Sequence, residues 1–191
     1  MLLLLESRPV LNESLYDEYL TRIVNHYFRD KRGKRTFRPL FLLNDLLRFW
    51  RTLCLNYELV RDDPSRPWRK KNINLKFSRM LTVFGTVLPV IAKPITDPGE
   101  VKNLTALTPL ERFATGLDII ADSELTQSFH EFLNAYEKFL SWKERMGGGN
   151  ELTDDEMGRE SRIEAQKFSS FIYKALSHDR IEEDFKKYLV L

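Results

Sequence analysis

The chain is poor in the residues that build covalent or metal-bound scaffolds. Its 191 residues include a single cysteine, Cys54, and three histidines. One thiol excludes an internal disulfide framework and a thiolate metal cluster. A reducing compartment is the simplest fit, so we expect a cytoplasmic protein. His26, His130 and His178 are far apart and lack acidic neighbours at ligand spacing, so no metal site is predicted.

Long apolar runs and phosphate-binding motifs are also absent from the sequence. No uninterrupted stretch approaches the roughly 18 apolar residues of a membrane span. The leucines at residues 2–5 are too few, and lack the basic lead-in, for a secretory signal. No membrane association is therefore predicted. The sequence contains neither GxxxxGK[ST] nor GxGxxG, and no nucleophile elbow, so no catalytic residue is predicted.

What the chain does contain is an ordinary balance of apolar and charged residues. Hydrophobic residues make up 42% of it and charged residues 30%, as in globular proteins. The formal net charge is +2. Overall electrostatics therefore does not indicate a nucleic-acid or membrane partner, and any such case depends on local patches.

Helical periodicity dominates the sequence. Leu15, Tyr19, Ile23 and Tyr27 recur at four-residue steps, with Tyr16, Leu20 and Val24 beside them, which predicts one apolar helix face. Asn12 or Ser14 is the predicted cap of this helix, and Thr108 and Thr153 each begin a capping box. No hairpin signal or repeat occurs. We therefore predict an all-α protein, a single bundle of six to eight helices, with a short strand or helical turn at its N-terminus. The predicted helices cover residues 12–28, 39–60, 73–92, 107–121, 123–146, 153–176 and 177–191.

Glycine-rich and basic segments separate the predicted helices. Residues 147–152 form a Gly-rich link between a main helical domain, residues 1–146, and a C-terminal helical pair, residues 153–191, which we expect to pack on the same bundle. Residues 29–39 and 61–72 are predicted to be basic loops, and residues 93–100 a turn. The helix at 123–146 is expected to turn inward Leu125, Phe129, Phe132, Leu133, Tyr136 and Leu140.

The predicted helix at 39–60 carries a polar stripe in an otherwise apolar segment. Asn44, Arg48, Arg51 and Glu58 follow one another at steps of four, three and seven, which places them on one side of a helix. Asp45 flanks this stripe and is a candidate partner of Arg48.

A second stripe lies near the start of the next apolar segment. Asn72, Lys76 and Arg79 follow one another at steps of four and three, with Asn74 and Ser78 beside them. If the two helices pack antiparallel, as a short connection favours, the stripes face each other or line one groove.

Two interpretations of the stripes remain open. In the first, the carboxylates and cations form a structural ion-pair network, because buried charge is costly without partners. In the second, the surplus of cations forms a groove for a phosphate or another anion, since arginine offers a rigid bidentate fork. The predicted ligand-binding residues are Asn44, Arg48, Arg51, Asn72, Lys76 and Arg79.

Part of the chain resembles a known family. LLLLESRPVLNESLYDEYLTRIVNHYF, FLLNDLLRFWRTLCLNYE and KKNINLKFSRMLTVFGTVL resemble the helical region that follows the catalytic domain in bacterial nucleotidyltransferases of the polymerase-β-like superfamily. The resemblance covers about residues 1–90. It implies that the arginine and lysine stripes contact a nucleotide or an acceptor, or brace the helical arm.

The family's catalytic signature has no counterpart in this sequence. Such enzymes carry a Gly-Ser motif and paired aspartates that hold magnesium on the nucleotide phosphates, and no Gly-Ser dipeptide with a downstream D-x-D occurs here. The resemblance therefore implies a bacterial, non-catalytic arm that needs a catalytic domain or partner chain to supply magnesium and nucleoside triphosphate chemistry. Met1 then marks a truncated gene, an isolated domain or half of a split protein.

Two interpretations from other classes compete with this one. In an all-helical homodimer, the polar stripes would bind no ligand and would serve only to hold the protein together. A nucleic-acid-binding module would use the basic loops, with Tyr27, Phe37 and Trp68 as stacking groups.

Overall fold

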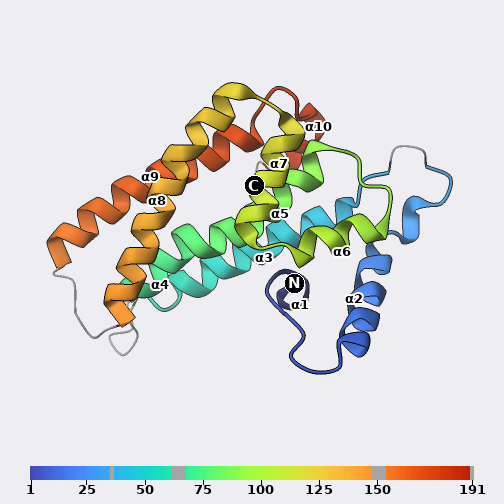
Figure 1. Ribbon diagram of the computed structural model, residues 1–191, viewed down its shortest axis with the longest axis horizontal. Helices are drawn as coiled ribbons and strands as arrows, with labels where there is room; N and C mark the ends of the chain where they lie inside the picture. The colour runs from blue at the N-terminus through green and yellow to red at the C-terminus, as the bar shows by residue number, and fades with distance from the viewer. Residues whose placement is uncertain (35–36, 62–67, 148–153, 190–191) are drawn as a thin grey trace.

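The computed structural model describes residues 1–34, 37–61, 68–147 and 154–189. These residues form helices without a strand, which confirms the predicted all-α class (Figure 1). The elements are α1 Leu2–Leu5, α2 Glu13–Tyr27, the 3-10 turn η1 Arg29–Lys31, α3 Leu40–Glu58, α4 Trp68–Asn74, the π turn η2 Leu75–Arg79, α5 Met80–Ala92, α6 Pro98–Ala106, α7 Pro109–Ile120, α8 Ser123–Gly147, α9 Asp154–Leu176 and α10 Glu183–Leu189.

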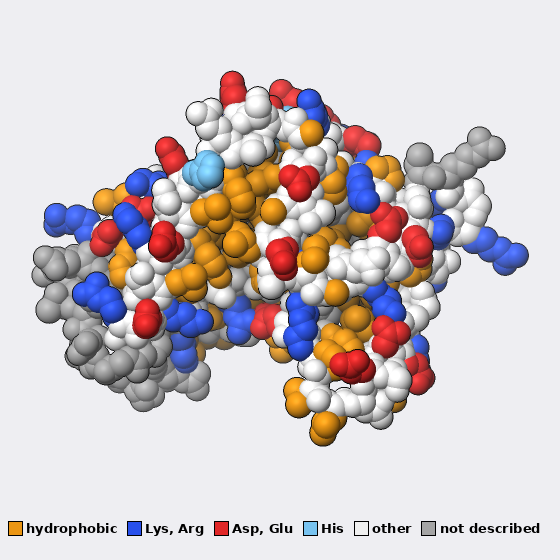
Figure 2. Space-filling view, in the orientation of Figure 1, with side chains coloured by type: hydrophobic (Ala, Val, Ile, Leu, Met, Phe, Trp, Pro, Cys, Tyr) orange, Lys and Arg blue, Asp and Glu red, His pale blue; other side chains and the backbone are white. Residues whose placement is uncertain are grey.

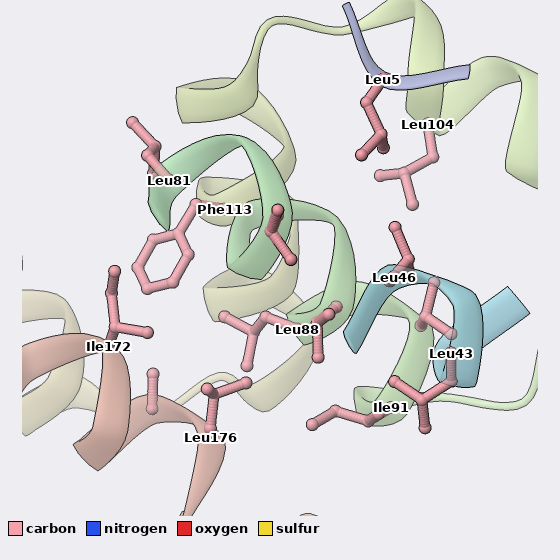
Figure 3. Packing of buried hydrophobic residues seen from close by; sticks show 14 of the residues in the cluster. Leu5, Leu43, Leu46, Leu81, Leu88, Ile91, Leu104, Phe113, Ile172 and Leu176 are labelled. Carbon is pink, nitrogen blue, oxygen red and sulfur yellow. The ribbon is translucent and has the colours of Figure 1, made fainter. Parts of the chain in front are cut away.

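Helix α5 is the centre of the bundle. It contacts α3, α7 and α9, and only its residue Phe84 and its two ends are not fully buried. Figure 1 shows α8 and α9 as a pair of long helices on one side of it, with α2 at the opposite end. In Figure 3, Leu88 lies between side chains of α3 and α9, and Phe113 of α7 lies beside Leu81. An apolar helix with neighbours on several sides buries its whole circumference.

Two glycines set the close contact between α5 and α7. A Cβ atom added at Gly85 would lie 2.6 Å from the Pro109 carbonyl oxygen, and one added at Gly116 would lie 2.6 Å from Cγ of Leu88. The backbone of Pro109 at one position and the side chain of Leu88 at the other lie so close that only a hydrogen fits. The pairing of α5 with α7 therefore depends on both glycines.

Aromatic rings join α8 and α9 to the helix that contains the π turn. Phe77 stacks on Phe139 with ring centroids 5.0 Å apart, and Phe132 stacks on Phe168 at 4.2 Å. Figure 2 shows further hydrophobic side chains gathered between α7 and α8, on the face toward the viewer. Stacked pairs of this kind add to the area that the rings bury.

One continuous helix is long and apolar enough to cross a membrane. Within the described residues this is Lys71–Ala92, with a mean hydropathy of 1.4 in its most apolar window. Of that window, 61% is buried inside the protein, and the core helix of a globular protein meets the same criterion. The sequence analysis considered only uninterrupted apolar runs and did not single it out.

The structure contains a helix that the sequence analysis did not predict. Helix α6 begins after Asp97, whose side chain accepts from the Gly99 backbone while Glu100 accepts from the Asp97 backbone. Pro98 occupies the first helical position. Proline and glycine suggested a turn at 93–100, but the same residues are helix-start signals when an acid follows three positions after the cap.

Several expected inward residues lie elsewhere. Leu15 and Tyr19 of α2 are 44% and 50% exposed, and Leu140 of α8 is 47% exposed, so these three assignments to the core are wrong. Of the same predicted face, Leu20 and Val24 are buried, as expected. Apolar periodicity identified the helix but did not decide which of two adjacent apolar stripes is covered.

Other predictions along the chain have mixed outcomes. Residues 2–5 form a helical turn, α1, with Leu4 and Leu5 each 2% exposed. Asn12, one of the two predicted caps, caps α2, and Thr108 caps α7 as expected. Of the Gly-rich link predicted at residues 147–152, Gly147 is the last residue of α8, and residues 148–152 lie outside the described residues, as does the predicted α9 cap Thr153. Helix α9 itself packs on α8, α5 and the π turn.

We expect Gly85→Ala and Gly116→Ala each to lower the free energy of unfolding by about 1–3 kcal/mol, because the added methyl group would overpack the α5–α7 contact. Urea denaturation measures this. Gly158→Ala on α9 is the matched control, since a Cβ there meets nothing within 4 Å and alanine is favoured over glycine in a helix by up to about 1 kcal/mol. Equal effects at the three positions would contradict the close-contact argument.

A buried carboxylate also joins α8 to α9. Glu164 is 5% exposed and accepts from Lys138 Nζ at 2.8 Å and from Lys167 Nζ at 3.2 Å. The hydrogen bond from Lys138 lowers the pKa of Glu164 below its ordinary value of 4.5, and Lys167 adds to this against the opposing effect of burial. Because the folded state favours the charged form, the interaction stabilises the fold above pH 4.5 and is lost as pH falls through the lowered pKa.

We therefore expect Glu164→Gln to lower the melting temperature at neutral pH, and the difference from the wild type to shrink as the pH falls below about 4.5. Thermal unfolding followed by circular dichroism at several pH values measures both effects. The control is Glu137→Gln on α8, an exposed carboxylate without an ion pair in the described part of the chain. A pH-independent loss in Glu164→Gln would point to packing alone.

Candidate functional site

A π turn interrupts the long helix where it passes the N-terminal segment. The turn spans Leu75–Arg79, and the backbone N–H of the next residue, Met80, donates a hydrogen bond to the Leu75 carbonyl oxygen, five residues earlier in the chain. This wider turn shifts the following residues around the helix axis. Asn74, Ser78 and Arg79, in and beside this turn, all line one recess. Single π turns occur frequently at functional sites.

The recess is an open cavity of about 460 Å³ where several elements meet. In Figure 2, basic and acidic side chains lie together in this region, between α8 and the N-terminal segment. Its lining comes from α1 and the segment after it, the end of α3, the end of α4 with the π turn, α5, the start of α7, and α8. The lining residues are Leu5, Glu6, Arg8, Tyr57, Asn74, Ser78, Arg79, Thr82, Thr108, Pro109 and Lys143.

Three cations and one carboxylate line the cavity. Arg79 forms an ion pair with Glu6 and also interacts with Tyr57. Burial alone would lower the pKa of Arg79, but the hydrogen bond and charge of Glu6 outweigh it and raise this pKa above its ordinary value. Within the described residues, Lys143 has no ion pair or hydrogen bond. The cavity is therefore electropositive.

Arg8 forms one side of the cavity and is held in place by backbone oxygens. Its guanidinium donates to the carbonyls of Thr105, Ala106 and Leu107 at 3.0–3.2 Å, at the C-terminal end of α6. Helix C-termini carry unpaired carbonyls and partial negative charge, so an arginine is favoured there. Arg8 therefore reaches the cavity from a fixed position.

Directly behind the cavity lies Arg112, whose side chain is fully buried. It donates to the carbonyls of Leu5, Thr105 and Leu107 at 2.8–3.0 Å and to the Thr86 hydroxyl at 3.1 Å. All of these partners are neutral. Burial, followed by the nearby charge of Arg8, lowers the pKa of Arg112 to about 10, so it stays charged at neutral pH. It fixes Leu5 and Leu107, the residues next to Glu6 and Thr108 of the cavity.

The structure separates the two predicted stripes. Asn44, Arg48 and Arg51 lie on the exposed face of α3, opposite the buried residues Leu42 and Leu46. None of the three lines the cavity. The stripes therefore do not share this groove.

The acidic residues beside the first stripe have other partners. Asp45 accepts a hydrogen bond from the Tyr27 hydroxyl at 3.0 Å, and Glu58 pairs with Arg61 at 2.7 Å. The expected bond between Asp45 and Arg48 is not formed. Burial and the Asp45 interaction raise the pKa of Tyr27, so its hydroxyl stays protonated.

Of the second stripe, Arg79 alone lines the cavity; Asn72 and Lys76 are half-buried outside it. The spacing placed Asn74 and Ser78 beside the stripe, and both line the cavity. It did not indicate Arg8 or Lys143, which are 135 positions apart in the printed sequence. No local signal indicates that such distant residues meet.

Other chemistry finds little support in the described part of the chain. No group of three or more His, Cys, Asp or Glu side chains there could hold a metal ion. Cys54 is half-buried, and burial raises the pKa of its thiol, which disfavours the reactive thiolate.

Comparison with known proteins adds no family. Neither a scan against protein-family models nor searches of curated proteins and solved structures found a match. The resemblance of residues 1–90 to nucleotidyltransferases thus stays a prediction from the sequence.

We expect Arg112→Met to lower the free energy of unfolding by at least about 2 kcal/mol, because the buried Leu5 carbonyl and Thr86 hydroxyl lose their donor. Guanidinium denaturation measures this loss. Arg8→Met is the control: it removes an exposed arginine that shares the Thr105 and Leu107 carbonyls, and water can replace it. Similar losses in the two variants would contradict a special role for the buried guanidinium.

Proposed function

We propose that this chain binds a phosphate-bearing ligand of the nucleotide class in the cavity beside the π turn, as the non-catalytic arm of a larger nucleotidyltransferase system. The observation that carries the proposal is the charge of the cavity: Arg8, Arg79 and Lys143 line it with Glu6 as the only carboxylate among its lining residues. Guanidinium and ammonium groups are the usual partners of phosphate oxygens in proteins.

The remaining lining suits the rest of such a ligand. Asn74, Ser78 and Tyr57 offer amide and hydroxyl groups for a sugar or a base, and Leu5 and Pro109 offer apolar surface. A cavity of about 460 Å³ falls within the usual size range of small-molecule sites. The site therefore combines a few polar groups with an apolar wall.

Lys143 and Arg79 have different roles in this proposal. The Lys143 ammonium is exposed and without a partner in the described part of the chain, so it binds a phosphate without first breaking a contact. Arg79 already holds Glu6, so an incoming phosphate competes with that carboxylate. Glu6 thus selects for ligands with more than one negative charge.

The cavity does not fit a magnesium ion. Mg²⁺ prefers carboxylate oxygens, and Glu6, the one carboxylate lining the cavity, is paired with Arg79. In this proposal the metal and the transfer chemistry belong to a catalytic domain or partner chain, and the arm holds the nucleotide or the acceptor. A cytoplasmic location fits this role.

We expect nucleoside triphosphate, and more weakly pyrophosphate, to raise the melting temperature of the protein, whereas the unphosphorylated nucleoside does not. At a ligand concentration a hundredfold above Kd the stabilisation is about 2.7 kcal/mol, or roughly 5–10 °C for a chain of this size. Differential scanning fluorimetry measures the shift.

The variant Lys143→Gln should fold normally and lose most of the ligand-induced shift. Lys174→Gln on α9 is the control, since it removes an exposed lysine away from the cavity lining. No shift with any phosphorylated ligand, or equal shifts in the two variants, would overturn the proposal.

A further inference from the structure

Positive charge is concentrated in one short part of this nearly neutral chain. Residues 29–51 contain eight Lys or Arg and two Asp or Glu, a local net charge of +6, whereas the rest of the chain carries −4. The overall value of +2 therefore conceals a strongly basic region. None of these residues lines the cavity beside the π turn.

The structure places part of this charge in a row on the outer face of α3. Phe41, Asn44, Arg48 and Arg51 follow one another at steps of three, four and three, and all four are exposed. From Phe41 to Arg51 the row is about 15 Å long at 1.5 Å per residue. Arg48 and Arg51 have no ion pair or side-chain hydrogen bond within the described residues.

The row continues across the 3-10 turn before α3. The guanidinium of Arg29 lies over the Phe41 ring, 5.4 Å from its centroid. Arg32 and Lys34 are exposed in the same turn region. The nearest acid, Asp30, is exposed and 3.8 Å from Arg29, a separation at which a surface ion pair contributes little.

Two other charged groups of this region, Arg38 and Asp45, are already engaged. Arg38 donates to the Ile91 carbonyl at 2.8 Å and to Glu182, and it lies over the Phe185 ring. Asp45 is held by Tyr27. What remains on the surface is thus almost entirely positive. We call the exposed set Arg29, Arg32, Lys34, Phe41, Asn44, Arg48 and Arg51 the basic row.

We propose that the basic row binds single-stranded nucleic acid. Cations spaced along one surface, with Arg48 and Arg51 unpaired in the described part of the chain, match the repeating phosphates of a strand. The exposed Phe41 ring, 53% accessible with an arginine against it, offers a surface on which a base stacks. Arg22 lies 6.0 Å from the centroid of the exposed Tyr19 ring on α2 and repeats this pairing of guanidinium and aromatic ring. A base that stacks must be unpaired, which selects single strands over duplex.

Fluorescence anisotropy with a labelled oligothymidylate of about 15 nucleotides tests this proposal, at several salt concentrations. We expect log Kd to rise linearly with log salt concentration. The double variant Arg48→Gln and Arg51→Gln should bind at least about tenfold more weakly, and its log–log slope should be smaller by about 1.4, as expected for two lost phosphate contacts.

The control variant carries Arg159→Gln and Arg162→Gln on α9. These arginines are also exposed and three residues apart, so the change in net charge and spacing is the same. It should bind like the wild type. Equal weakening of the two double variants, or no salt-dependent binding by the wild type, would overturn the proposal.

A third variant separates nucleic acid from an acidic protein partner. Phe41→Leu keeps an apolar side chain at this exposed position and removes the ring, so it should weaken oligothymidylate binding about fivefold or more. Competition with polyglutamate provides the second measurement. If Phe41→Leu has no effect and polyglutamate displaces the strand at equal charge concentration, the row is a site for an acidic protein and the proposal is wrong.

Discussion

The arrangement of the chain depends on a buried arginine whose charge is met by helix ends. Arg112 has no exposed surface, and its donors reach the last residue of α1, the C-terminal end of α6 and the Thr86 hydroxyl of α5. Carbonyls at helix C-termini carry partial negative charge and need donors. One guanidinium therefore donates to hydrogen-bond acceptors in three segments at once. Residues in or next to these segments, Leu5, Thr82 and Thr108, line the cavity. An isolated buried cation would be very costly; here the backbone supplies the compensation that carboxylates usually give.

The cavity and the basic row use arginine in different ways. Around the cavity, Arg8 and Arg79 are fixed by carbonyls and by Glu6, so a ligand meets a rigid set of donors. On α3, Arg48 and Arg51 extend into solvent without such partners in the described part of the chain. The two surfaces have no residue in common, which makes their proposed ligands independent. A small anion suits the rigid, recessed set, and an extended polyanion suits the open row.

The candidate site was only partly predictable, because it is assembled from separate parts of the chain. Arg79 stood out in the sequence as a cation in an apolar helix, and it does line the cavity. Arg48 is also a cation in an apolar helix but faces solvent, because Leu42 and Leu46 on the opposite side of α3 are buried in the core. The π turn beside Asn74 and Ser78 depends on a local change in hydrogen bonding, which residue spacing does not reveal.

The sequence alone determined the helical class, most helix positions and several of their start signals, because these depend on contacts within a few residues, such as the capping box at Thr108. It also determined where charge is concentrated. Only the tertiary structure decided which apolar stripe is covered, as in α2, and which cations find partners, as with Arg79 and Glu6. These outcomes depend on packing between residues far apart in the chain, and local periodicity does not reveal the energy of such contacts.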